Sequence, residues 1–165
     1  MPEKKVIFDA TVLSNFIITD ATTMIKNLYA HRGIITWEVF DELSSGSTKE
    51  PALRDVNLLL TPKCFNLITL SKKEHTFYVT LLDSLGKGEA SCIAHARYSR
   101  CTVATDDKAA RRICERYKIS CTGTIGILLS ACRDGVLTIE KADQLLQTMV
   151  HAGFYSPVRR ISDII

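Results

Sequence analysis

The sequence lacks several patterns that would assign it at once to a class of protein. Its six cysteines are scattered without a Cys-x-x-Cys pair, which argues against a zinc knuckle or a dense disulfide framework and predicts reduced, mostly buried thiols. No stretch approaches the ~18 consecutive apolar residues of a membrane span, and the N-terminal segment has no signal-peptide pattern. We therefore expect a cytoplasmic protein that makes no contact with a membrane.

Two catalytic classes also lack support. The segment Gly86-Lys87-Gly88 does not have the spacing of a phosphate-binding P-loop, and no motif supports Ser/His/Asp catalysis. The four histidines stand in separate contexts and predict no metal site. The net charge of +3 would help the chain approach a polyanion, but it is too small to identify one.

What the sequence does contain is an ordinary globular composition, with 165 residues of which 46% are hydrophobic and 24% charged. Short apolar runs, which predict strands, alternate with helical patterns; the runs lie at 6–8, 34–36, 65–70, 102–105 and 119–121. The alternation predicts a three-layer α/β/α sandwich with a central, mainly parallel sheet of four to five strands. We expect one domain over residues 1–165, with the motifs at 6–129 and C-terminal helices at 136–165.

Carboxylates follow two of the predicted strands. Asp9 ends the first run, and Asp106 and Asp107 follow the fourth. The carboxyl ends of parallel strands meet at one edge of a sheet, so Asp9 and Asp106 are expected to lie there together. Glu89 opens the helix that leads into the fourth strand, and it faces the same cleft if the first and fourth strands are neighbours.

Carboxylates gathered in this way repel one another, by about 4 kcal/mol for two unit charges 4 Å apart at an effective dielectric of 20. Such a cluster either raises its pKa values or holds a cation. Oxygen ligands without His or Cys favour Mg²⁺ or Mn²⁺, and one or two such ions beside a basic groove can cleave phosphodiesters. The alternative interpretation is a set of unrelated, solvated surface acids.

Five segments carry a more specific pattern. They are VIFDATVL at 6–13, TWEVFDEL at 36–43, LGKGEA at 85–90, TDDKAAR at 105–111 and TGTIGILL at 122–129. In these segments and their order the chain resembles the PIN domain family, the metal-dependent ribonuclease fold that includes VapC-like toxins. Within that family it is most similar to a branch described mostly as a domain of unknown function.

The resemblance implies roles for individual residues. The catalytic acids would be Asp9, Glu42, Glu89 and Asp106, and the metal ligands would be Asp9, Glu89, Asp106 and Asp107. Asp107 is equally suited to be the acidic start of the next helix, and Glu38 shares a helix side with Glu42. Supporting hydroxyls would be Thr11 and Thr105, although Ala10 stands where the family has a hydroxyl. Candidates for phosphate binding are Lys87, Lys108, Arg111 and Arg112.

Three functions follow as hypotheses. The resemblance implies an endoribonuclease that uses Mg²⁺ or Mn²⁺, acts as the toxin of a toxin–antitoxin pair, and has RNA, a small antitoxin and a second copy of itself as partners. The alternative is a catalytically silent PIN-like module that binds RNA or protein. A phosphatase of the haloacid dehalogenase type is disfavoured, because the motif at 8–11 lacks that family's second Asp two residues after the first.

Overall fold

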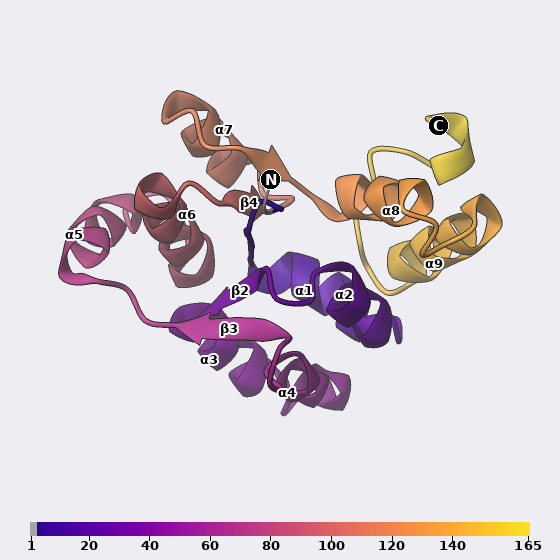
Figure 1. Cartoon of the computed structure of the whole chain (residues 1–165), viewed down its shortest axis with the longest axis horizontal. Helices are drawn as coiled ribbons and strands as arrows, with labels where there is room; N and C mark the ends of the chain where they lie inside the picture. Colours follow the sequence, from indigo (N-terminus) through magenta and orange to yellow (C-terminus); the bar gives the residue numbers. More distant parts are fainter. Residues whose placement is uncertain (1–2) are drawn as a thin grey trace.

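A parallel five-stranded sheet forms the centre of the computed structural model, which describes residues 3–165 (Figure 1). Its strands are ordered β3-β2-β1-β4-β5. They comprise β1 (Val6–Phe8), β2 (Gly33–Thr36), β3 (Phe65–Ile68), β4 (Thr102–Ala104) and β5 (Cys121–Thr122). This arrangement confirms the predicted α/β fold and places the first and fourth strands side by side.

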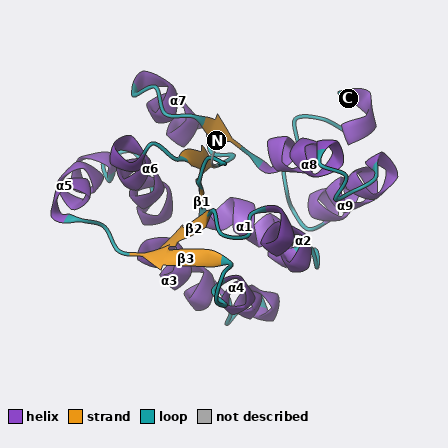
Figure 2. Ribbon diagram, viewed as in Figure 1, coloured by secondary structure: helices purple, strands orange, loops and turns teal. Residues whose placement is uncertain are grey.

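Helices cover both faces of the sheet, as Figures 1 and 2 show. One side carries α5 (Lys72–Leu81), α6 (Lys87–Ser99) and α7 (Lys108–Arg116). The other side carries α1 (Ala10–Ile17), α2 (Thr22–Leu28), α8 (Thr124–Arg133) and α9 (Ile139–His151). Near β2 and β3 lie α3 (Trp37–Gly46), the 3₁₀ segment Pro51–Asp55 and α4 (Val56–Leu59).

The tail beyond α9 ends in a second 3₁₀ segment, Ile161–Asp163. None of the helices in residues 3–165 is long and apolar enough to cross a membrane.

Local sequence explains where several elements begin. Ser71 and Glu74 form a capping box at the start of α5, in which the Ser71 hydroxyl accepts from the Glu74 N–H at 3.2 Å and the Glu74 carboxylate accepts from the Ser71 N–H at 2.9 Å. Pro51 occupies the first position of the 3₁₀ segment, where its missing N–H is not needed, and α4 follows directly. Gly123 stands immediately before α8, which begins at Thr124.

The core lies between the central strands and the helices packed on them. Ile7 and Phe8 of β1 and Val103 of β4 are completely buried. On α6, small residues such as Ala90 and Ala94 are also fully buried, as expected for a helix packed on the sheet. The Cys92 thiol donates to the Phe8 carbonyl oxygen at 3.4 Å and so fixes α6 directly over β1.

Candidate functional site

Asp9 and Asp106 lie together where the strand order changes direction. From β1 the chain proceeds to β2 and β3 on one side, and β4 and β5 lie on the other. Ligands of open α/β sheets bind in the crevice at such a switch point, outside the carboxyl ends of the strands. Asp9 directly follows β1, and its N–H donates to the carbonyl oxygen of Ala104, the last residue of β4, at 3.0 Å.

Asp9 is a buried acid with one carboxylate oxygen left without a partner. Only 1% of the residue is exposed. Its Oδ1 accepts from the Val12 N–H at 2.7 Å and caps α1, whereas Oδ2 has no hydrogen-bond partner in residues 3–165. Burial raises the pKa of Asp9 to about 7, and the charges of Glu89 and Asp106 add to the rise; the nearby Thr105 hydroxyl and the Val12 N–H offset part of it. A buried oxygen in this position lacks a positive partner.

Glu89 and Glu42 extend the acidic cluster from two helices. Glu89 lies in the first turn of α6. The Glu42 side chain is largely exposed, but its carboxylate lies against the same turn, since a Cβ added to Gly88 would be 2.6 Å from Glu42 Oε2. Burial of the carboxylate raises the pKa of Glu42, and the charge of Glu89 raises it further. Four acids from four separate elements are thus coupled electrostatically.

A chain of hydroxyl groups holds the two helices in place. The Ser91 hydroxyl of α6 donates to the Gly88 carbonyl oxygen at 2.7 Å and lies 2.8 Å from the Thr36 hydroxyl. Thr36 ends β2 and caps α3 by accepting from the Val39 N–H at 3.1 Å. The start of α6, which carries Glu89, is therefore tied to the start of the helix that carries Glu42. The sequence analysis did not identify this link.

Asp106 is held by the start of α8. Its Oδ1 accepts from the Thr124 N–H at 2.9 Å, and its Oδ2 accepts from the Thr124 hydroxyl at 2.5 Å. The amide of Asn15 on α1 in turn donates to the Thr124 hydroxyl oxygen at 3.0 Å. Thr124 and Asn15 are both buried, so the relay is shielded from water. Neither Thr124 nor Asn15 is among the site residues predicted from the sequence; Asn15 is a buried polar residue in a mostly apolar helix.

The remaining predicted acids and hydroxyls have identifiable local positions. Asp107 is exposed and caps α7, accepting from the Ala110 N–H at 2.7 Å through Oδ1; metal binding through its other oxygen stays a prediction. Thr105 is buried and its hydroxyl oxygen accepts from the Asp107 N–H at 3.2 Å. Thr11 is exposed in the first turn of α1, and Asp9 rather than Thr11 caps that helix. A supporting role for the Thr11 hydroxyl stays a prediction.

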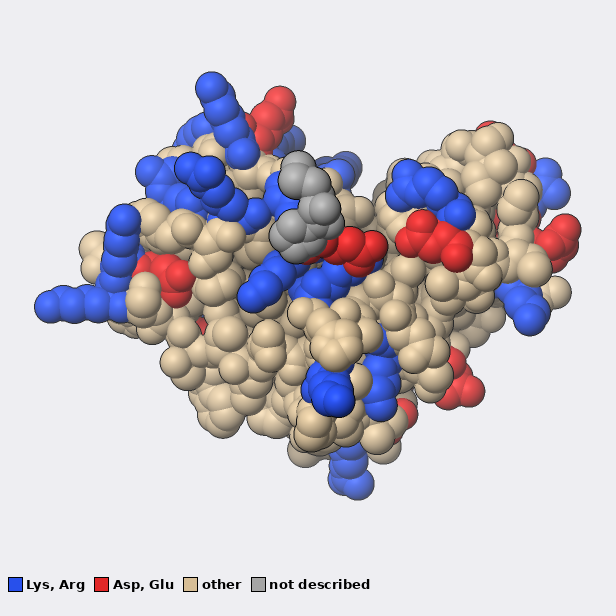
Figure 3. Space-filling model, in the orientation of Figure 1, with Lys and Arg blue, Asp and Glu red and all other residues tan. Residues whose placement is uncertain are grey.

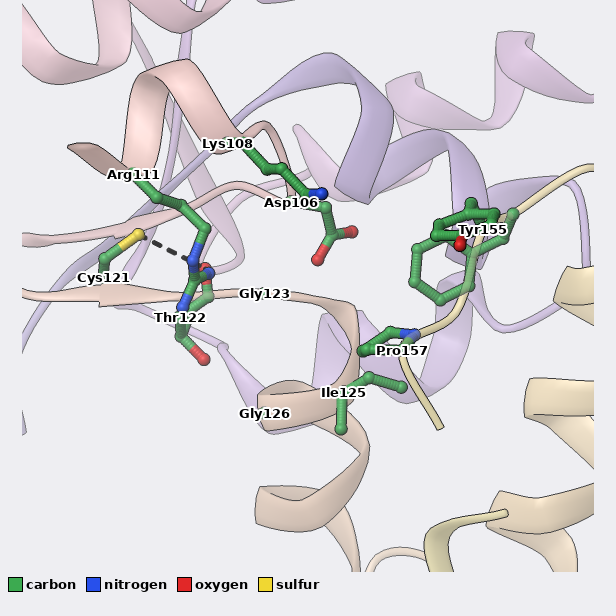
Figure 4. A pocket seen from close by; sticks show the side chains of 11 residues that line it. Asp106, Lys108, Arg111, Cys121, Thr122, Gly123, Ile125, Gly126, Tyr155 and Pro157 are labelled. Carbon is green, nitrogen blue, oxygen red and sulfur yellow. Dashed lines mark hydrogen bonds between the residues drawn. The ribbon is translucent and has the colours of Figure 1, made fainter. Parts of the chain in front are cut away.

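A cleft of about 780 Å³ opens beside Asp106 (Figure 4). Two of the four predicted phosphate-binding residues, Lys108 and Arg111, line the cleft, whereas Lys87 and Arg112 are exposed and lie outside its lining. Phosphate binding by any of them stays a prediction. The wall opposite Arg111 comes from the C-terminal tail through Phe154, Tyr155 and Pro157. Figure 4 shows the Asp106 carboxylate between the Arg111 side and the Tyr155 ring. Nothing in the sequence had indicated a role for the tail.

Arg111 and Cys121 form the far wall of this cleft. The Arg111 guanidinium donates through Nη1 to the carbonyl oxygens of Thr105, at 2.9 Å, and Thr122, at 3.1 Å, and so joins the ends of β4 and β5. A hydrogen bond from the Cys114 thiol lowers the pKa of Cys121 to about 7, and the Arg111 charge favours the thiolate further, although burial opposes both. The cleft thus contains a thiol of lowered pKa near the Arg111 guanidinium.

The donor set fits a hard divalent cation. In residues 3–165, no three or more His, Cys, Asp or Glu side chains are placed to hold a metal together as they stand. The coupled acids nevertheless offer only carboxylate oxygens, and Asp9 Oδ2 is buried without a partner, which is the environment that Mg²⁺ or Mn²⁺ would neutralise. Glu38, which shares a helix side with Glu42, lies toward α5 instead. Burial raises the pKa of Tyr78 on α5, and the charge of Glu38 raises it further.

Comparison with known proteins agrees with this fold. A family model described as PIN domain matches residues 5–165. The chain is similar to VapBC2 from Rickettsia felis, solved bound to a DNA fragment from the promoter, with a TM-score of 0.53 and 17% identity over 72% of this chain and 97% of that one. A toxin–antitoxin complex from Klebsiella pneumoniae matches with a TM-score of 0.49 and 20% identity over 62% of this chain and 87% of that one. A search of curated proteins gives no match.

Proposed function

This chain belongs to the PIN domain family, and from that premise we propose that it is an endoribonuclease dependent on Mg²⁺ or Mn²⁺. The observation that carries the proposal is Asp9, which is buried among acids from three other elements with one oxygen unpartnered. A site of that kind is unfavourable for folding unless a cation occupies it. Its position at the switch point of the sheet is where open α/β sheets bind their ligands, and Asp106 of the same cluster lines the adjoining cleft.

In this proposal Asp9, Glu89 and Asp106 hold the ion or ions, with Asp107 as a further candidate ligand. Such an ion, when bound, lowers the pKa of a water and stabilises the leaving oxygen of a phosphodiester. Thr124 fixes the orientation of Asp106 through both carboxylate oxygens. Glu42, whose pKa is raised, is suited to accept a proton from the attacking water. We expect products with a 5′-phosphate and a 3′-hydroxyl.

The RNA path runs through the cleft beside Asp106. Lys108 and Arg111 supply positive charge on one side, and Tyr155, which is 89% exposed, offers an aromatic face on the other. Basic grooves with aromatic side chains bind single-stranded nucleic acid, because phosphates contact the cations and bases stack on the rings. An unpaired segment of RNA therefore fits this cleft better than a duplex does.

We also propose that the chain is the toxin of a toxin–antitoxin pair, works as a homodimer, and is inhibited by a small antitoxin seated over the acidic site. The structural likeness to VapBC2 from Rickettsia felis supports this role. Expression of the chain alone in a bacterium should stop growth, and Asp106→Asn should abolish the effect. Unimpaired growth with confirmed expression of the active enzyme would remove the toxin role and leave the nuclease proposal in place.

A catalytically silent module is the second candidate. It is favoured by the absence, within residues 3–165, of a preformed three-ligand group, and by the hydrogen bonds that occupy both oxygens of Asp106. Calorimetric titration with Mn²⁺ separates the two. The nuclease proposal predicts Mn²⁺ binding that Asp9→Asn weakens strongly, whereas RNA binding without any Mn²⁺ binding would identify the silent module.

A further inference from the structure

The amino-terminal edge of the sheet, opposite the acidic site, carries a line of basic side chains. Strand pairing aligns Phe65, Gly33, Val6 and Thr102 across four strands. The residues two positions before them are Lys63, His31, Lys4 and Arg100. The fifth strand continues the pattern, because Val103 pairs with Cys121 and so brings Lys118 level with Arg100. We call Lys63, His31, Lys4, Arg100 and Lys118 the basic row.

The basic row is continuous in space. The His31 N–H donates to the Cys64 carbonyl oxygen at 3.0 Å, and Arg32 reaches across from β2 to the Lys4 carbonyl oxygen at 3.4 Å. A second cavity, of about 340 Å³, is lined by basic residues of the row together with Arg97, and no Asp or Glu of residues 3–165 lines it. All five side chains of the row are exposed. Five strands about 4.8 Å apart give the row a length of about 19 Å.

The backbone at these positions is unusual for basic residues. His31 and Lys63 have φ of 67°, Arg100 has φ of 53° and Lys118 has φ of 55°. They are four of the five non-glycine residues with positive φ in the described part of the chain. Arg100 is the carboxyl-terminal cap of α6 and Lys118 directly follows the cap of α7, where glycine or asparagine fits this left-handed conformation best. His31 and Lys63 stand in the turns that follow α2 and α4 and lead into β2 and β3. Lys or Arg stands at three of these four sites and His at the fourth, which points to a role for the positive charge along this edge.

A favourable interaction with helix dipoles is the simpler explanation, since cations stabilise the carboxyl ends of helices. That interaction is equally available to a basic residue in the last helical turn, where the backbone is unstrained. The helix dipole does not explain why a basic residue has a left-handed backbone at four positions, or why these four positions are aligned across the strands. Figure 3 shows Lys and Arg gathered over α6 and α7, which flank this part of the edge.

We propose that the basic row binds the phosphate backbone of RNA, at a site separate from the acidic pocket. Contacts with phosphates depend on a regular series of cations and need no apolar pocket, which is what the row provides. Glu3 lies near the row, but it forms an ion pair of 2.9 Å with Arg32, which is not part of the row. The negative charge of Glu3 is therefore balanced by a cation outside the row. The row would hold the body of an RNA on one edge of the sheet, independently of cleavage at the other.

The test uses the full chain with Arg100→Asn and Lys118→Asn combined, because asparagine removes the charge and tolerates the left-handed backbone. The matched control combines Lys49→Asn and Lys141→Asn, which remove two exposed lysines outside the row. Binding of a labelled RNA hairpin is measured by fluorescence anisotropy in EDTA, over about 50 to 200 mM salt. Thermal unfolding of both variants verifies that they are folded.

Each lost phosphate contact removes about 0.7 from the slope of log K against log salt, so the two substitutions together remove about 1.4. At about 0.1 M salt, one decade below 1 M, we therefore expect the row variant to bind RNA roughly 25-fold more weakly. The control should match the wild type. Equal affinity and equal slope in the row variant would overturn the proposal and leave the helix dipole as the explanation. Binding of polyglutamate in preference to RNA by the wild type would overturn it as well. The assay contains no metal and measures no cleavage, so its result does not depend on the nuclease proposal.

Discussion

Thr124 bonds to both carboxylate oxygens of Asp106, through its N–H at 2.9 Å and its hydroxyl at 2.5 Å. The hydroxyl also accepts from Asn15, so its proton is directed at Asp106. The two oxygens of the acid are therefore fixed in direction before any ligand arrives. In a metal site, groups that orient a ligand in this way commonly govern affinity and rate.

Replacing Thr124 with alanine should therefore impair catalysis without touching the acids. We expect Thr124→Ala to lower the single-turnover rate of RNA cleavage by about 10- to 100-fold, because Asp106 loses its orienting hydroxyl. Thr124→Ser keeps the hydroxyl and should retain most of the rate. If serine and alanine reduced the rate equally, with both variants folded, the hydroxyl would have no role in orienting Asp106.

A methyl group at Gly88 should displace Glu42. The added Cβ would lie 2.6 Å from Glu42 Oε2, and the side chain would have to move away from Glu89. Gly88→Ala lies within α6, where alanine favours the helix by up to about 1 kcal/mol, so the melting temperature should not fall. The cleavage rate should fall by about tenfold or more, because small displacements of catalytic groups have large effects.

A double-mutant cycle tests the cause of that loss. If Gly88→Ala acts by displacing Glu42, adding it to Glu42→Gln should cause little further loss. Fully additive effects of the two substitutions would show instead that the methyl group disturbs some other part of the site.

The raised pKa of Asp9 predicts how metal-free stability depends on pH. The pKa of the Asp9 carboxyl group is about 7 in the folded chain, against its ordinary value of 3.8 in the unfolded chain. Between these two pH values, the folded chain holds a proton that the unfolded chain has lost. Stability therefore falls as pH rises from about 4 to 7, by up to about 4 kcal/mol from this group. In EDTA, Asp9→Asn should be more stable than the wild type at pH 8, and the difference should shrink at pH 5.

Urea unfolding at the two pH values measures this difference. At pH 8, above the pKa of about 7, the Asp9 carboxylate is mostly ionised, so adding Mn²⁺ should stabilise the wild type strongly by neutralising that charge and should stabilise Asp9→Asn little. A stability difference that is identical at pH 5 and pH 8 would contradict the assigned environment of Asp9.

Cys121 should be the most reactive thiol near neutral pH. The Cys114 hydrogen bond and the Arg111 charge lower the pKa of Cys121 to about 7, which favours the reactive thiolate at pH 8. Cys132 is also partly exposed, but burial and nearby acids raise its pKa. Iodoacetamide at pH 8 should label Cys121 first, as read by peptide mass spectrometry. Labelling should block RNA cleavage, since the thiol lines the cleft. Preferential labelling of Cys132 would contradict this assignment.

Much of the fold could be predicted from the sequence, because strand and helix periodicities and the order of the motifs are local properties. The parallel topology predicted that Asp9 and Asp106 share the carboxyl edge of the sheet, whereas the pairing of β1 with β4 was only a hypothesis that the structure bears out. The capping of α1 by Asp9 rather than Thr11 was not predictable in the same way, because either side chain could accept from the first helical turn.

The supporting parts of the site depend on contacts that are distant in sequence. Asn15 meets Thr124 from 109 positions away, and Thr36 meets Ser91 from 55 positions away, so no spacing rule reveals either pair. Tyr155 reaches the cleft only because the tail folds back beside α8. The basic row likewise becomes visible only when the register of all five strands is known.

The most direct test of the acidic site as a metal-dependent nuclease is the single-turnover cleavage rate of a labelled RNA with Mn²⁺ present. The wild type should cleave the RNA and leave 5′-phosphate ends, and both EDTA and Asp106→Asn should abolish cleavage while the folded structure persists. Cleavage at the wild-type rate in Asp106→Asn, or in EDTA, would contradict the assignment of this site.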